Sequence, residues 1–127
     1  MRNFEDLVRE RILSTTLGEA STHADASTID RHDIEIFAGM LYGLIRAGAR
    51  REGPEAFQEV FLHFADGERW QTSSEEELEL VRAALLAAID RFSQEAHALR
   101  VYFEAMELGG ATESEATEKA IAVLGAT

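Results

Sequence analysis

The feature that most constrains the fold is a long amphipathic segment at about residues 74–108. Its apolar residues follow one another in steps of three or four, which is the spacing of one side of a coiled-coil helix. Ser74 precedes acidic residues that suit a first helical turn, and Gly109 follows the last apolar position. The residues that set the spacing are Leu78, Val81, Leu85, Ile89, Phe92, Ala96, Leu99, Phe103 and Met106. The pattern predicts one long helix.

Helical spacing of apolar residues also recurs on both sides of this segment. It predicts further helices over about residues 4–17, 28–51, 54–64 and 112–124, with a loop at about 18–27 between the first two. We therefore expect an all-α fold, a bundle of about five helices around the long central one.

The composition is that of a globular chain. With 127 residues, 46% of them hydrophobic and 28% charged, we expect one helical domain over residues 1–127. There is no cysteine, so a disulfide framework and a thiolate metal site are both excluded. We find neither the apolar stretch of a signal peptide nor that of a membrane span, so we expect a cytoplasmic protein with no membrane partner.

The length of the predicted helix raises a question of assembly. About 34 helical residues span roughly 50 Å, whereas a compact domain of this size is only about 36 Å across. Every residue over 83–89 is apolar, which predicts that this part of the helix is covered on nearly all sides. Either the helix breaks near Ser93, or a partner covers the projecting part. We favour a homodimer, with a candidate interface of Leu85, Phe92, Ala96, Leu99, Phe103 and Met106.

Negative charge is concentrated in the second part of the chain. The net charge is -12, and residues 52–127 carry 16 acidic against 5 basic side chains. Such a surface repels phosphate backbones, so we expect no direct binding of nucleic acid and allow for a basic protein partner. Carboxylates along a rigid helix can also imitate a phosphate backbone. The candidate acidic surface consists of Glu75, Glu76, Glu79, Glu104 and Glu107.

Sequence motifs of catalysis and metal binding are missing. None of His23, His32, His63 and His97 falls in a recognised ligand spacing, and no serine lies in a nucleophile elbow. No glycine-rich phosphate loop is present either. We therefore assign no catalytic, cofactor-binding or metal-ligating residue, expect no cofactor, and do not expect an enzyme.

A row of small residues lies on one face of the second predicted helix. Gly39, Gly43 and Ala47 recur every four residues, which allows another helix to approach closely. A glycine costs up to about 1 kcal/mol of helix propensity, so we interpret the row as a tight helix crossing that offsets this cost. The alternative is a space reserved for a small ligand.

Three functions follow from these patterns. The first is a non-enzymatic helical adaptor for protein–protein interaction that forms a homodimer. The second is an acidic inhibitor, or nucleic-acid mimic, that blocks a basic, nucleic-acid-handling protein. The third is a helical domain that senses a small molecule at the Gly39 and Gly43 crossing.

Overall fold

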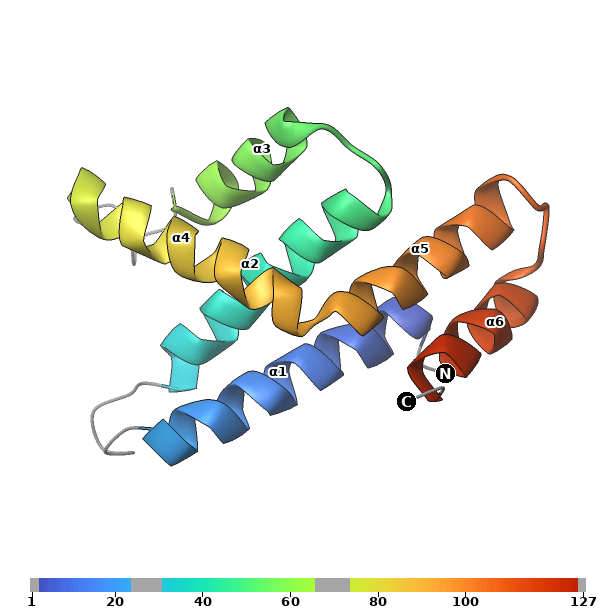
Figure 1. Cartoon of the computed structure of the whole chain (residues 1–127), viewed down its shortest axis with the longest axis horizontal. Coiled ribbons are helices and arrows are strands. Elements are labelled where there is room, and N and C mark those ends of the chain that lie inside the picture. Colours follow the sequence, from blue (N-terminus) through green and yellow to red (C-terminus); the bar gives the residue numbers. More distant parts are fainter. Residues whose placement is uncertain (1–2, 24–30, 66–73, 126–127) are drawn as a thin grey trace.

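The computed structural model describes residues 3–23, 31–65 and 74–125. These parts of the chain form helices joined by short connections, and no strand occurs in them (Figure 1). The predicted all-α fold is confirmed. The helices are α1 (Phe4–His23), α2 (Arg31–Ala49), α3 (Pro54–Ala65), α4 (Glu75–Arg91), α5 (Ser93–Glu107) and α6 (Glu113–Gly125).

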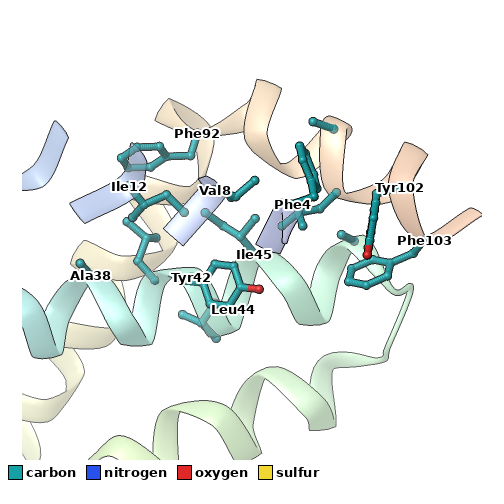
Figure 2. Packing of buried hydrophobic residues seen from close by; sticks show 14 of the residues in the cluster. Phe4, Val8, Ile12, Ala38, Tyr42, Leu44, Ile45, Phe92, Tyr102 and Phe103 are labelled. Carbon is teal, nitrogen blue, oxygen red and sulfur yellow. The ribbon is translucent and has the colours of Figure 1, made fainter. Parts of the chain in front are cut away.

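The central helix of the fold is α2, and the prediction that residues 74–108 hold this place was wrong. α2 packs against α1, α3, α4 and α5, because it carries apolar residues on several of its sides. Figure 2 shows Val8 of α1 beside Ile45 of α2, and Phe4 of α1 next to the Tyr102 ring of α5. The buried side chains form one cluster to which all the described helices contribute.

The predicted long helix is broken at Phe92. α4 ends at Arg91 and α5 begins at Ser93, and the chain changes direction between them (Figure 1). The Phe92 N–H bonds to the Ile89 carbonyl at 3.0 Å, one residue short of the α-helical pattern. The break lies near Ser93, as the alternative expected, although the N-cap residue of α5 is Phe92 and not Ser93, so no side-chain hydrogen bond caps the helix. Phe92 is buried, so its ring lies in the core at the point where the chain turns.

The apolar stretch over residues 83–89 is not covered on nearly all sides, contrary to prediction. Leu85 is fully buried, and Ala88 and Ile89 are half-buried, whereas the remaining side chains of the stretch lie at the surface. The reason is that α4 packs mainly against α2, which covers one side of it. The exposed residues are Ala83, Ala84, Leu86 and Ala87.

Local signals set most of the helix ends. The Ser74 hydroxyl accepts a bond from the Glu77 N–H, and the Thr112 hydroxyl accepts one from the Glu115 N–H, both at 3.2 Å. Gly18 does not end α1, which continues to His23, so the predicted loop over 18–27 is helical in its first part. Its remaining residues lie outside the described part of the chain.

The interpretation of the glycine row as a tight crossing is confirmed. A Cβ added to Gly43 would lie 2.8 Å from Val60 Cγ1 of α3, and one added to Gly39 would lie 3.6 Å from the Phe64 ring. Gly48 of α2 faces Phe57 of α3 in a similar way. The crossing is therefore filled by side chains of α3.

Candidate functional site

The residues predicted as a dimer interface lie largely inside the chain's own core. Four of them, Leu85, Phe92, Leu99 and Phe103, are buried, and Ala96 is half-buried. Met106 alone of the six is exposed, at 37%. As a set these residues do not present a surface to a partner, because the break at Phe92 lets both helices turn the same apolar side inward.

The residues predicted as an acidic surface fall into two separate groups. Glu75, Glu76 and Glu79 are exposed in the first turns of α4. On α5, by contrast, Glu104 pairs with Arg51, and Glu107 lies 3.7 Å from the Arg50 guanidinium. The five carboxylates therefore do not form one continuous array, and the α5 pair is partly neutralised within the chain.

An apolar stripe runs along the solvent-exposed surface of α4. We call it the α4 face, and it consists of Leu80, Ala83, Ala84 and Ala87, which are all exposed. Their spacing of i, i+3, i+4 and i+7 places them along one side of the helix. Leu80 is 71% exposed, although a leucine gains about 1.5–3 kcal/mol from full burial. This side of α4 is apolar, and the part of the chain that the structure describes leaves it exposed.

A groove continues the α4 face toward α1 and α2. Its volume is about 410 Å³, and Ala84 and Ala87 belong to both the face and the groove. α2 contributes Phe37, which is half-buried, and Leu41, which is fully buried beneath the groove. We call it the α4 groove; its lining residues are Thr16, Glu19, Phe37, Leu41, Ala84, Ala87, Ala88, Arg91 and Phe92.

The charged residues beside the α4 face are mostly acidic. We call the exposed carboxylates of α4 the acidic rim, which consists of Glu75, Glu76, Glu77, Glu79 and Asp90. The basic side chains of the same helix are Arg82 and Arg91, and Arg91 is already bonded to Glu19 of α1. The surroundings of the stripe therefore carry a net negative charge.

Two other clefts border α2 and hold polar side chains. One, of about 330 Å³, lies beside the Gly43 crossing and includes Tyr42, Arg46 and His63. The other, of about 300 Å³, lies at the junction of α4 and α5 and includes Asp90 and His97. Within the described ranges no three His, Cys, Asp or Glu side chains gather closely enough to hold a metal ion.

A buried tyrosine links α2 to α1. The Tyr42 hydroxyl donates to Glu5 Oε2 at 2.7 Å, and Arg46 Nε lies 3.1 Å from the same oxygen. The Arg9 guanidinium stacks over the Tyr42 ring at 4.7 Å. Burial, followed by the hydrogen bond and the charge of Glu5, raises the pKa of Tyr42 above its ordinary value of 10.0.

The raised pKa of Tyr42 predicts a loss of stability at alkaline pH. The folded state holds the phenolic proton more tightly than the unfolded state, so this contribution is complete below about pH 10 and falls as the pH rises beyond it. Tyr42→Phe should lower the free energy of unfolding by about 1 kcal/mol at pH 7. Urea unfolding at a series of pH values should show the two proteins converging above about pH 10. A constant difference at all pH values would contradict this assignment.

No protein-family model, curated protein or solved structure matches this chain. No helix in the described ranges is both long enough and apolar enough to span a membrane. The function of this chain therefore has to be inferred from the surface of the molecule itself.

Sequence reasoning missed the α4 face. The sequence does not show which side of α4 is buried, because alanine occurs both in cores and at surfaces. One signal was present in the sequence: Leu80 lies outside the stepped apolar series that begins at Leu78, so one side of the helix had to leave it exposed.

Proposed function

We propose that this protein is a non-enzymatic helical interaction module that binds another protein through the α4 face and the α4 groove. The observation that carries the proposal is the exposure of Leu80 within a continuous apolar stripe that runs into a groove. Exposed apolar surface of this kind is commonly a site of protein–protein contact. A groove beside a helix suits the docking of a second helix.

Self-association stays a prediction, although the long continuous helix from which we expected it is broken. We expected a homodimer because a continuous helix would project from the domain, and the break at Phe92 removes that projection. The candidate interface is also largely buried within the chain. Self-association would therefore have to use a surface outside that candidate interface, such as the α4 face.

Neither of the other two functions gains support from a specific observation. Imitation of a phosphate backbone needs a long array of free carboxylates, and those of α5 are separated from those of α4 and paired with Arg50 and Arg51. Sensing of a ligand between the helices at the glycine row needs space within the crossing, and Val60 and Phe64 occupy that place; the open cleft of about 330 Å³ lies beside the crossing.

Photo-crosslinking tests the proposed function. A photo-reactive amino acid in place of Leu80 should give one or a few discrete protein adducts in lysate of the source cells, because the α4 face lies against the partner. The matched control places the same group at Leu62 of α3, an exposed leucine on another helix. Adducts from the Leu80 position alone support the proposal. Equal adducts from both positions, or none from Leu80, would show that α4 is not the binding surface.

A further inference from the structure

The chemistry around the α4 face identifies the kind of partner that it fits. We propose that its occupant is a basic amphipathic helix of another protein. The apolar side of that helix lies on the α4 face and in the α4 groove, and its lysine or arginine side chains lie against the acidic rim. This inference rests on the proposed function and adds the class of partner to it.

The shape of the surface favours a helix. The α4 face is straight and one helix wide, and three of its four residues are alanines, which let a second helix backbone approach closely. The α4 groove, at about 410 Å³, has room for large apolar side chains that project from such a helix. Phe37, which is half-buried, and the exposed Ala84 and Ala87 provide the apolar contact for them.

The charges favour a basic helix. Five exposed carboxylates make up the acidic rim, and the first turns of α4 hold four of them. Arg82 is the only basic side chain of α4 without a described ion pair, since Arg91 is bonded to Glu19. The whole chain carries a net charge of -12, which steers a basic partner toward it and repels an acidic one.

A second copy of the chain fits this surface less well, because it brings the same acidic rim. When two α4 helices run in the same direction, Glu76 lies opposite Glu76. A pairing in opposite directions can set Leu80 of each copy against Ala87 of the other. It then sets Glu76 opposite the other copy's Arg91, which is already bonded to Glu19, and Glu77 opposite its Asp90. In both arrangements carboxylates approach one another, which opposes association.

Three synthetic peptides of equal length test the proposal. Each has leucines along one side of a helix, and the other side carries lysine, glutamine or glutamate. Fluorescence anisotropy of the labelled peptides with the full chain should show the lysine peptide binding roughly tenfold tighter than the glutamine peptide in about 0.01 M salt. The difference should vanish in about 1 M salt, and the glutamate peptide should bind least. Equal binding of the three peptides would overturn the inference.

Two pairs of variants locate the binding. Leu80→Ser should weaken the lysine peptide about tenfold or more, and the control Leu62→Ser should leave it unchanged. Neutralising Glu76, Glu77 and Glu79 to glutamine should weaken it roughly tenfold in low salt. The same change at Glu113, Glu115 and Glu118, which are exposed on α6, should have little effect. Equal losses in both triple variants would reduce the effect to general attraction and overturn the proposal.

Light scattering of the free chain separates this inference from the proposed function. A monomer that binds the lysine peptide supports the basic helix as occupant. A dimer that Leu80→Ser dissociates would make a second copy the occupant and overturn the inference, while the interaction through α4 stands. Crosslinking from Leu80 without any preference for basic peptides would likewise overturn the inference, while the interaction through α4 stands. Only the loss of crosslinking specificity at Leu80 counts against the proposed function itself.

Discussion

Replacing Gly43 with leucine is expected to destabilise the fold by about 3 kcal/mol or more. The first added atom already lies 2.8 Å from Val60 Cγ1, so a leucine side chain forces α3 away from α2. The gain in helix propensity, about 0.8 kcal/mol, is too small to offset this overlap. Thermal unfolding followed by circular dichroism should show a fall in Tm of about 10 °C or more.

Gly18 provides the matched control for this experiment. It is also a glycine inside a helix, but a Cβ added there meets nothing within 4 Å. Gly18→Ala should therefore raise the free energy of unfolding by about 0.5–1 kcal/mol. The milder variant Gly43→Ala should be destabilised, and adding Val60→Ala should recover part of the loss. If Gly43→Ala is as stable as Gly18→Ala, the close crossing is not present in solution.

Arg11→Met is expected to lower the free energy of unfolding by about 2 kcal/mol. Arg11 Nε lies 2.6 Å from Glu95 Oε1, and this contact joins α1 to α5. Glu95 is only 5% exposed, so without the guanidinium its charge stays buried and unpaired. The Arg11 side chain is itself 49% exposed, so solvent moderates the loss below the 3–5 kcal/mol of a fully buried pair.

A double-mutant cycle isolates this interaction. Arg11→Met combined with Glu95→Met should be less destabilised than the sum of the two single changes, because no buried charge is left. The control is Arg31→Met, which removes an exposed pair with Glu35 on α2 and should cost less than about 0.5 kcal/mol. Additive effects in urea unfolding would mean that the contact between α1 and α5 contributes little.

The contacts of Gly43 and Arg11 lie away from the proposed binding surface. Gly43 fixes how α3 lies on α2, and the Arg11 contact fixes α5 on α1, whereas the α4 face takes part in neither. Leu80 can therefore be changed without disturbing the elements that hold the fold. This separation makes loss of binding in Leu80→Ser interpretable when its melting temperature is unchanged.

Local sequence signals determined where three of the helices, α3, α4 and α6, begin and how α2 and α3 meet. Pro54 opens α3, and the hydroxyls of Ser74 and Thr112 cap α4 and α6, because each of these effects acts within one helical turn. The need for close approach at Gly43 was also readable, since glycine inside a helix carries a cost that packing must offset. These features depend on neighbours close in the sequence.

Only the tertiary structure decided the break at Phe92 and the exposure of the α4 face. The stepped apolar pattern continues through Phe92 without interruption, so the sequence alone favoured a single helix. Burying Phe92 together with Leu85 and Leu99 in one small core requires the chain to turn there. α2 can cover only one side of α4, and exposed alanines cost little because each buries little apolar area. The apolar side of α4 that faces solvent therefore depends on how many other helices pack against α4. No local sequence pattern contains that information.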